Sequence, residues 1–492
     1  MKWKLVTGPL EGLKSEGLAV GVFEDLDFSR LGDGDSIAAS AKRVRFKGKP
    51  GESYYAFELF GKPKKHLLVV GLGKKDECKP ATFRDAAALA SRKFRERTLK
   101  SAAIAFPLDG KGQAAGPSLQ ALVEGVHFGN GRFDKYLTDR EAKFEGLGRV
   151  LIVVPRKGRA LEECAQLGAL TASAVLYARG LVTEPSNVLT PSRMAEEAKR
   201  VAKEAGLAIK VLGPSECEAM GMGAYLAVAK GSKNEPRFIH VSYRPKGARF
   251  HLGFVGKGLT FDSGGLSLKP NEGMAAMKSD MSGAAAVLAA MKAIGELRPK
   301  VAVDAVMAMA ENMPGGGAYK PGDILTSMSG KTIEILNADA EGRLTLADAL
   351  TYVQKQKVDA VVDLATLTGA CIVALGPDIA GAMTNDQGFL DELLAAAREA
   401  GEELWQLPMP AAYNKFIQSP VADMANSARI RWGGAITAGL FLKNFVENGT
   451  PWVHLDIAGP AYRDEDGAEA FRAEGSGVGV RTLVRLVLNK EK

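Results

Sequence analysis

Short apolar runs alternate with stretches of helical spacing over roughly the first third of the chain. The runs end at Gly, Pro or charged residues, as buried strands do. They lie at residues 17–24, 66–73, 101–108 and 150–155. Residues 81–97 and 117–129 between them carry apolar positions at helical spacing. Strands that alternate with helices predict a largely parallel sheet with helices packed over it.

A long helical pattern over residues 161–183 closes this first part. The next eight residues, EPSNVLTP, contain two prolines and an asparagine, which predict a loop. Because 492 residues are too many for one core, we expect two domains. The sequence predicts an N-terminal α/β domain over 1–160, a connecting helix and loop over 161–190, and a larger domain over 191–492.

The same alternation resumes after the loop. Helices are predicted at residues 191–206, 282–297 and 344–357, and strands at 207–213, 237–244, 250–256, 301–312 and 358–369. The pattern favours a second, doubly wound α/β domain. The fold class is therefore α/β, with a smaller N-terminal and a larger C-terminal domain.

Composition narrows the class of protein. The chain is 46% apolar and 25% charged, as soluble globular proteins are, and its net charge is +7. Its four cysteines are scattered, which favours free thiols, and no HExxH motif occurs among its five histidines. The N-terminus lacks an apolar segment of signal-peptide length, and the apolar stretch 364–376 is too short to span a bilayer. We interpret that stretch as a buried strand and loop, and expect a soluble, cytoplasmic protein without membrane contact.

Charged residues embedded in Gly-rich, apolar stretches mark the candidate site. They occupy three segments, 256–270, 277–287 and 337–350. The residues are Lys257, Asp262, Lys269, Asp280, Asp339, Glu341 and Arg343. Such charges are costly to bury unless they are paired or bind a metal. Each segment follows a predicted strand or precedes a predicted helix, and ligands bind at the carboxyl ends of strands in open α/β sheets. We therefore expect the three segments to converge on one crevice.

Carboxylate oxygens suit divalent cations such as Mg²⁺, Mn²⁺ or Zn²⁺, and four carboxylates suffice for two ions with bridging. Lys257 and Lys269 could each be a neutral nitrogen ligand or polarise a carbonyl group, and Arg343 offers a planar fork for an anion. Taken alone, Asp262 in its DSGG sequence is a turn residue and Asp280 a helix N-cap. Their joint occurrence in one domain favours the metal site.

Other polar or sulfur-containing positions have structural interpretations. His251 and His454 lie in apolar strand-like runs and are interpreted as structural histidines, and the Met-rich run 307–313 as core. Met277, beside Asp280, could line an apolar substrate pocket. The basic segments 47–52 and 61–66 are interpreted as solvated faces.

The segment 337–344, NADAEGRL, resembles the signature octapeptide of the leucyl aminopeptidases (cytosol aminopeptidases), which are dinuclear metallo-exopeptidases. The segments GKGLTFDSGGLSLKP and MKSDMSGAA resemble the family's metal and lysine segments at matching separations. Further blocks of similarity lie at 178–191, 311–323, 363–370, 419–442 and 452–461. The resemblance covers essentially all of 178–492 and is specific; in the first domain it rests on residues 124–136.

The resemblance implies a role for each charged residue. One divalent ion, Mn²⁺ or Zn²⁺, is expected at Lys257, Asp262, Asp280 and Glu341. A second is expected at Asp262, Asp339 and Glu341 with the backbone carbonyl of Asp339. Lys269 would polarise the scissile carbonyl, and Arg343 would hold a bicarbonate that acts as general base toward the bridging water.

The resemblance also implies a substrate and an assembly. Peptides with a free N-terminus would lose an N-terminal residue, leucine or another apolar one, by attack of a metal-bridging hydroxide. The residues expected to line the substrate site are Met277, Asn337, Ala340, Thr366, Leu367 and Gly369. A homohexamer of two stacked trimers is expected. The chain departs from the family at Ala338, where a threonine is usual, and the missing hydroxyl could loosen support of the site.

Two other functions fit parts of the sequence. Some members of the family also bind DNA, and the excess of basic residues permits this, but no DNA-binding motif occurs and the basic segments lack interleaved aromatics. A two-metal phosphoesterase would also use the carboxylates. It does not match the family blocks, and the phosphate-binding GxxxxGK[ST] loop does not occur.

Overall fold

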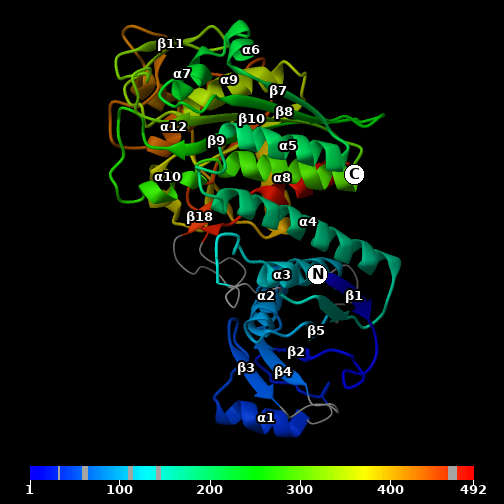
Figure 1. Cartoon of the computed structure of the whole chain (residues 1–492). Coiled ribbons are helices and arrows are strands. Elements are labelled where there is room, and N and C mark those ends of the chain that lie inside the picture. Colours follow the sequence, from blue (N-terminus) through cyan, green and yellow to red (C-terminus); the bar gives the residue numbers. More distant parts are fainter. Residues whose placement is uncertain (32–33, 58–64, 109–114, 140–145, 464–473, 492) are drawn as a thin grey trace. The chain divides into compact units, whose positions relative to one another are not determined.

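The computed structural model describes the chain except residues 32–33, 58–64, 109–114, 140–145, 464–473 and 492 (Figure 1). The described residues form two compact units, which divide between Leu176 and Tyr177. The division falls inside one long helix, α4 (Arg159–Thr183). The two-domain α/β architecture predicted from the sequence is confirmed.

Unit 1 is built on a six-stranded sheet. Its elements are β1 (Lys2–Val6), β2 (Gly17–Val22), α1 (Gly34–Arg43), β3 (Ser53–Phe57), β4 (His66–Gly71), α2 (Pro80–Glu96), β5 (Ser101–Ala105), α3 (Ala115–Asn130) and β6 (Arg149–Val153). The strand order is β1-β6-β5-β2-β4-β3. Every neighbouring pair is parallel except β3 with β4, so the predicted largely parallel sheet is confirmed.

Apolar side chains cover both faces of this sheet. One cluster joins Leu68, Ala102 and Ile104 to α2 and α3, and the other joins Val20 and Val69 to α1. Alternating strand residues point to opposite faces, so strands buried on both faces read as continuous apolar runs.

The interpretation of residues 61–66 as a solvated face is wrong for Lys65, and 61–64 lie outside the described residues. Lys65 is buried, and its Nζ donates to backbone carbonyls of Leu10, Glu11 and Leu13. Burial lowers the pKa of Lys65. A basic run in the sequence does not reveal a lysine whose charge is satisfied by carbonyls some 50 positions away.

Unit 2 is built on an eight-stranded mixed sheet. Its strands are β7 (Ala208–Leu212), β8 (Arg237–Tyr243), β9 (His251–Asp262), β10 (Ala302–Asn312), β13 (Ala360–Ala365), β14 (Ala380–Thr384), β15 (Leu404–Gln406) and β17 (Trp452–Asp456). The order is β15-β14-β17-β13-β9-β10-β8-β7. The four central strands β17, β13, β9 and β10 are parallel to one another, so their carboxyl ends meet at one edge.

Helices cover both faces of this sheet, as a doubly wound domain requires (Figure 1). The helices of unit 2 are α5 (Pro191–Ala205), α6 (Pro214–Ala219), α7 (Gly223–Ala229), α8 (Ser282–Leu297), α9 (Gly342–Gln354), α10 (Gly369–Leu375), α11 (Gln387–Ala400), α12 (Gly434–Lys443) and α13 (Val480–Lys490), with the 3₁₀ segments η2 (Met274–Ser279) and η3 (Ala411–Ile417). α8 packs on β9, β10 and β13 from one side, and α9 packs on the same strands from the other.

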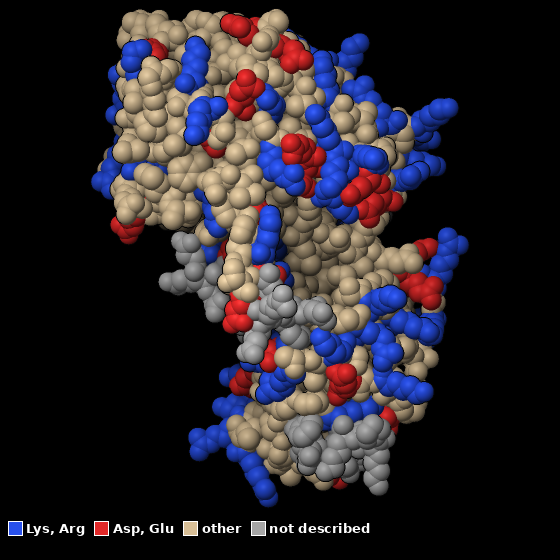
Figure 2. Space-filling model, in the orientation of Figure 1, with Lys and Arg blue, Asp and Glu red and all other residues tan. Residues whose placement is uncertain are grey.

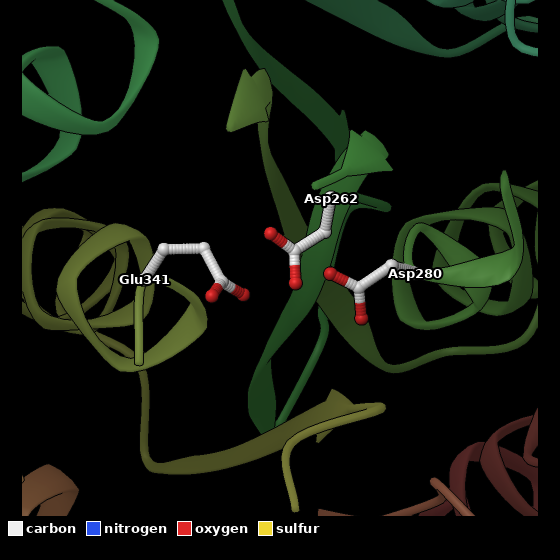
Figure 3. A group of neighbouring side chains, drawn as sticks. All are labelled: Asp262, Asp280 and Glu341. Atoms are coloured by element: carbon white, nitrogen blue, oxygen red, sulfur yellow. The ribbon is translucent and has the colours of Figure 1, made fainter. Parts of the chain in front are cut away.

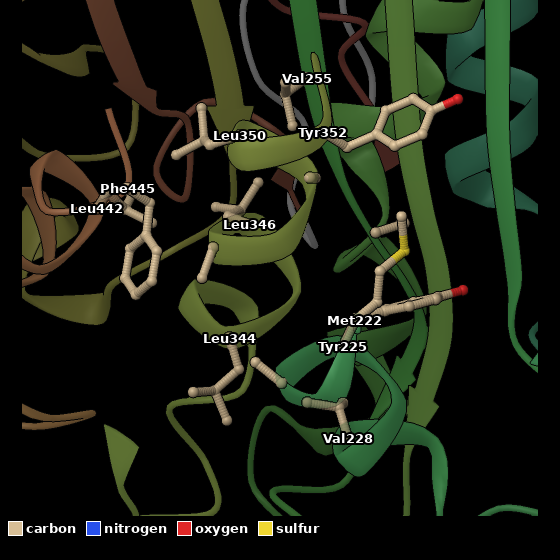
Figure 4. Close-up of a cluster of buried hydrophobic side chains, with 14 of the residues drawn as sticks. Met222, Tyr225, Val228, Val255, Leu344, Leu346, Leu350, Tyr352, Leu442 and Phe445 are labelled. Atoms are coloured by element: carbon tan, nitrogen blue, oxygen red, sulfur yellow. The ribbon is translucent and has the colours of Figure 1, made fainter. Parts of the chain in front are cut away.

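The core of unit 2 surrounds α9. Leu344, Leu346 and Leu350 of this helix pack among Met222 and Tyr225 near α7 and apolar side chains of the α12 region (Figure 4). Every residue from Gly342 to Val353 is buried. A helix that is buried all round is held in place by packing on every side. Its N-terminus, which includes the last three residues of the signature segment, is therefore fixed relative to the sheet.

Two short sheets complete the described fold. β11 (Ile324–Thr326), β12 (Thr332–Glu334) and β16 (Met424–Ala425) form one, in which β12 is antiparallel to β11 and parallel to β16. β18 (Tyr462–Arg463) pairs antiparallel with β19 (Glu474–Gly475).

Two predicted elements differ from the structure. The strand predicted at 250–256 continues to Asp262, so Lys257 and Asp262 lie in β9 itself and not in a loop after it. The stretch 364–376, interpreted as strand and loop, ends in helix α10, where the Thr368 side chain caps the N-terminus by accepting from the Cys371 amide.

The structural interpretation of two histidines agrees with their contacts. His251 Nε2 lies 2.7 Å from Asp304 Oδ2, and His454 Nδ1 lies 2.6 Å from Asp363 Oδ1. The second ring nitrogen of buried His454 has no partner among the described residues. Met307 and Met309 are buried, as expected of core methionines.

Lys and Arg do not form an uninterrupted field on the face of unit 2 that Figure 2 shows, because Asp and Glu lie among them. On α5, for example, Arg193 pairs with Glu196 at 2.7 Å and Arg200 with Glu204 at 2.8 Å. Within the described part of the chain, no helix is both long and apolar enough to cross a membrane.

Candidate metal centre

Three buried carboxylates meet at the carboxyl edge of the central strands. Asp262 ends β9, Asp280 lies between η2 and α8, and Glu341 directly precedes α9. One oxygen of each lies within 4.8 Å of the others, and all three side chains point toward a common space (Figure 3). The predicted convergence of the three segments is therefore seen in the structure.

Two lysines are bound to these carboxylates. Lys257 Nζ lies 2.8 Å from both Asp280 Oδ1 and Glu341 Oε1 and donates to the carbonyl of Thr366 at 3.0 Å. Lys269 Nζ lies 2.9 Å from Asp262 Oδ2 and also pairs with Asp339. The lysines differ in exposure: 3% of the Lys257 side chain and 20% of the Lys269 side chain is exposed.

Burial and mutual repulsion shift the pKa values of these acids. Burial raises the pKa of Asp262, Asp280 and Asp339, and repulsion by Glu341 adds to each of these shifts. Burial alone would raise the pKa of Glu341, but Lys257 and Lys269 outweigh it and lower that pKa. Because these carboxylates repel one another when they are ionised, a cation bound among them would be stabilised.

The donor atoms fit divalent cations. Asp280 Oδ2 and Glu341 Oε2 are buried without a hydrogen-bond partner among the described residues. Buried polar atoms without partners are uncommon in folded proteins, and a bound ion would satisfy the two oxygens. Carboxylate oxygens are donors that both Mn²⁺ and Zn²⁺ accept. The residues present therefore fit metal ions.

Asp262 acts as a turn residue and as a member of the cluster at the same time. Its Oδ1 accepts from the Gly264 amide at 2.9 Å and from Asn312 Nδ2 at 2.8 Å. Gly264 has a φ of +83°, which favours glycine. Because Oδ1 is held by these two donors, Oδ2 is the oxygen that faces Lys269. Asp280, by contrast, makes no capping bond: the N-cap of α8 is Met281.

The main chain at Ala338 is held without a side-chain hydroxyl. Its carbonyl accepts from Tyr319 OH at 2.6 Å and from Asn312 Nδ2 at 3.0 Å, and its amide donates to Ser267 Oγ at 2.9 Å. These bonds anchor the signature segment through its backbone, independently of the usual threonine.

Arg343 lies in the first turn of α9 and is buried. Its Nη1 donates to the carbonyl of Asn426 at 2.7 Å, and its Nε has no partner among the described residues. Burial lowers the pKa of Arg343 to about 10, against the opposing effect of Glu341. A buried guanidinium with an unused donor is suited to binding an anion.

Three of the residues expected to line the substrate site lie on the segments that carry the cluster, and the other three follow β13 at the same edge of the sheet. Thr366 Oγ1 donates to Asp280 Oδ1 at 2.7 Å, and Asn337 Oδ1 accepts from the Asp339 amide at 2.9 Å. Leu367 follows β13, and its amide donates to Asp456 Oδ1 at 3.1 Å. Of the remaining three, Met277 lies in η2, Ala340 precedes Glu341, and Gly369 begins α10 and is exposed.

Sequence reasoning assigned no role to several buried polar residues around the site. They are Asn312, Tyr319, Asn426 and Asp456. Asn312 and Asp456 each end a central strand, β10 and β17, in apolar surroundings, and this position was the available signal. For Tyr319 and Asn426, which lie in irregular segments, the sequence pattern offers no comparable signal.

Together, the fold and the cluster define an α/β protein whose larger sheet carries, at the carboxyl edge of its central strands, a group of buried carboxylates able to hold a divalent cation. The chain also matches two family models: "Cytosol aminopeptidase family, catalytic domain" over residues 176–484, and the family's N-terminal domain over 19–140. The chain belongs to the cytosol aminopeptidase family. It is accordingly a metal-dependent aminopeptidase, a hydrolase that acts on peptides.

Individual relatives agree with this membership. The chain is 44% identical to a "Probable cytosol aminopeptidase" of Alkaliphilus oremlandii (strain OhILAs), with 100% of both chains covered, and 45% identical to one of Aquifex aeolicus (strain VF5), with 96% of both covered. Among solved structures, a mutant of tomato leucine aminopeptidase is similar with a TM-score of 0.91 and 36% identity, covering 99% of this chain and 96% of that one. A bottromycin maturation enzyme in complex with Mn is similar with a TM-score of 0.88 and 36% identity, covering 97% and 100%.

Proposed function

We propose that this chain removes N-terminal residues, preferably leucine or other apolar ones, from peptides with the help of two divalent ions per subunit. The observation that supports it most is the buried cluster of Asp262, Asp280 and Glu341, joined to two lysines, in a member of this family. The similar tomato enzyme is named a leucine aminopeptidase, and the similar maturation enzyme was solved with Mn.

In this proposal Lys257, Asp262, Asp280 and Glu341 hold one ion, and Asp262, Asp339 and Glu341 with the Asp339 carbonyl hold the other. Mn²⁺ and Zn²⁺ both suit these donors. Bound there, the ions would supply Lewis-acid activation of water at neutral pH and electrostatic stabilisation of developing negative charge. The substrate's free amine would bind at the first site, which accounts for action at the N-terminus.

The chain's own residues complete the chemistry. Lys269 is partly exposed, and its Nζ pairs with both Asp262 and Asp339. It would donate to the scissile carbonyl oxygen and stabilise the charge that develops there. Arg343, with its unused Nε, would hold a bicarbonate that accepts a proton from the attacking water. Met277, Asn337, Ala340, Thr366, Leu367 and Gly369 would line the pocket for the substrate.

We further propose that the chain works as a homohexamer of two stacked trimers in the cytoplasm, the compartment that the family's name contains. Residues 1–160 would form a domain for assembly or regulation, 161–190 the connection, and 191–492 the peptidase domain. No particular observation favours a second function such as DNA binding.

The test is hydrolysis of leucyl-p-nitroanilide by protein that has been stripped with a chelator and then resupplied with Mn²⁺ or Zn²⁺. N-acetyl-leucyl-p-nitroanilide is the control. Cleavage of the free-amine substrate alone, restored by metal, is expected. A folded protein that cleaves neither substrate with any metal, or both equally well, would contradict the proposal. Light scattering of the same sample tests the hexamer.

A further inference from the structure

Asn426 lies directly after β16, and its side chain is completely buried. β16 runs parallel to β12, with Ala425 in register with Glu334. Asn426 therefore stands beside the point where the chain leaves β12 and enters the segment that carries Asp339 and Glu341. It belongs to neither the carboxylate cluster nor the set of residues expected around the substrate.

The Asn426 side chain bonds the signature segment with both ends of its amide. Oδ1 accepts from the amides of Leu336, at 2.8 Å, and Asn337, at 3.3 Å. Nδ2 donates to the carbonyls of Asn337, at 2.7 Å, and Ala340, at 3.4 Å. One side chain from about 90 positions away thus bonds the backbone on both sides of Asp339.

The Asn426 backbone bonds Arg343 as well. Its carbonyl accepts from Arg343 Nη1 at 2.7 Å, and its amide donates to the carbonyl of Glu334 at 2.9 Å. Nε of Arg343 has no partner among the described residues, so the bond to Asn426 is the one that orients the guanidinium in the described structure. Asn426 is therefore bonded both to the segment of the second metal site and to the arginine beside it.

We propose that Asn426 is a positioning residue that fixes the 336–340 segment and the Arg343 guanidinium in one relative orientation. It acts through the metal ligands Asp339 and Glu341 and through Arg343, without touching substrate. The inference rests on the roles proposed above for these three residues. Groups that orient ligands typically change metal affinity or activity 10- to 100-fold when they are removed.

A purely structural role would have different consequences, and the chain offers a matched control. Asp423 bonds the same pair of strands at their other end: its Oδ2 accepts from the Thr332 amide at 2.8 Å and from Thr332 Oγ1 at 2.9 Å. Asp423 is exposed, and within the described part of the chain its carboxylate bonds Thr332 and not the site. Asp423→Ala therefore weakens the β12–β16 sheet without releasing the signature segment.

The experiment compares full-length Asn426→Ala, Asp423→Ala and the unchanged chain. Mn²⁺ affinity is measured by the electron paramagnetic resonance of free Mn²⁺. The parameters kcat and KM are measured with leucyl-p-nitroanilide at saturating Mn²⁺, and folding is measured by thermal unfolding. Asn426→Ala is expected to weaken Mn²⁺ binding and lower kcat, each by about 10- to 100-fold, with KM changed less than threefold. Asp423→Ala should leave Mn²⁺ affinity and kcat within twofold of the values for the unchanged chain. If Asn426→Ala does not fold, Asn426→Ser, which keeps one hydroxyl, replaces it.

A double-mutant cycle separates the contribution of Arg343. Asn426→Ala keeps the backbone carbonyl that bonds Arg343, so it reaches this arginine only if the loss of the side-chain bonds lets that carbonyl shift. At saturating Mn²⁺, where the effect on metal binding no longer counts, adding Asn426→Ala to Arg343→Ala is expected to lower kcat less than threefold further, because the remaining route through Arg343 is gone. An undiminished effect in that background would overturn the proposed action on Arg343. Mn²⁺ affinity and kcat of Asn426→Ala within twofold of the unchanged, active chain would overturn the whole inference. Because Mn²⁺ binding needs no substrate, an inactive unchanged chain would contradict the proposed function without deciding this inference's metal-binding part.

Discussion

At the scale of single residues, the two lysines of the cluster occupy different environments. Lys257 is buried and holds three oxygens, those of Asp280, Glu341 and the Thr366 carbonyl. Lys269 pairs with two carboxylates and keeps a fifth of its side chain exposed. The first environment suits a group that holds the cluster together, and the second suits a group that meets substrate.

We therefore expect Lys269→Met to lower kcat about 10²- to 10³-fold, the loss typical of one donor to a developing oxyanion, without weakening Mn²⁺ binding. Lys257→Met should weaken Mn²⁺ binding instead. Steady-state kinetics and Mn²⁺ titration of both variants test the distinction. A Lys269→Met protein with nearly unchanged kcat would contradict the role proposed for this lysine.

Asp348 makes the stability of the fold depend on pH. It is fully buried in α9, where Oδ2 accepts from the Tyr225 amide at 2.8 Å and Oδ1 from the Met328 amide at 2.7 Å. Burial raises its pKa to about 7, against the effect of these backbone donors. Burial raises the pKa of the nearby Cys217 thiol to about 12, and the charge of Asp348 adds to this shift. The folded-state pKa of Asp348 exceeds the unfolded value of about 3.9, so its contribution is most favourable below about pH 4 and is lost as pH rises through about 7.

The variant Asp348→Asn isolates this dependence. At pH 5 it should be less stable than the unchanged chain by about 1–3 kcal/mol, because its amide group directs a donor at a backbone amide. The gap should narrow as pH rises from about 4 to 7, because over this range Asp348 ionises in the unfolded state of the unchanged chain while the folded state keeps its proton. Urea unfolding at each pH measures it, and parallel pH curves for the two proteins would refute the assignment.

At the scale of elements, α9 approaches β9 so closely that only a glycine fits where the helix begins. A Cβ on Gly342 would lie 2.7 Å from Lys257 Nζ and 2.8 Å from its Cδ. Lys257 cannot withdraw without leaving Asp280 and Glu341. We expect Gly342→Ala to weaken Mn²⁺ binding and lower kcat at least about 10-fold, as a displaced neighbour of a metal site does.

Gly180 in α4 provides the control for this prediction. A Cβ there meets open space, so Gly180→Ala should stabilise the fold by up to about 1 kcal/mol and leave activity unchanged. Mn²⁺ titration, kinetics and thermal unfolding of the two variants give the comparison. Equal, small effects of both substitutions would show that Lys257 has room to move.

Strands and helices with a clear period were predictable, because burial on one or both faces leaves a pattern in the sequence. β9 was predicted too short for a definite reason. Lys257 and Asp262 interrupt its apolar run, and both can be buried only because Asp280, Glu341 and Asn312 from other segments bond them. α10 was missed because GACIVAL lacks polar alternation, and one capping bond from Thr368 marks its start.

The charged members of the site were predictable for the opposite reason. Each is a charged residue among apolar neighbours, and a buried charge needs an ionic or metal partner. The family resemblance then assigns each of them a role. Tyr319 and Asn426 gave no such signal, because their importance lies in bonds to the backbone of Ala338 and Leu336, which no sequence pattern encodes. Only the structure shows these bonds from side chains to a distant backbone segment.

At the scale of the whole molecule, each unit has its own apolar core, but the proposed metal site lies in unit 2 alone. Unit 1 has its own clusters on both faces of its sheet, and unit 2 has the core around α9. All the proposed metal ligands, from Lys257 to Glu341, belong to unit 2. A ligand that binds only the folded form stabilises what it binds, by about 2.7 kcal/mol at a concentration of 100 Kd.

Mn²⁺ should therefore protect the two units unequally. In hydrogen exchange followed by mass spectrometry, adding Mn²⁺ to chelator-stripped protein should slow exchange in β9, β10 and α9 and leave β2, β4 and β5 unchanged. A Glu341→Gln protein, which keeps the size of the side chain but loses the charge, is the control and should show no metal-dependent protection. Equal protection of both units by Mn²⁺ would mean that they unfold as one cooperative body. Protection confined to unit 2 would mean that metal binding stabilises the peptidase domain alone, because the two cores then open independently.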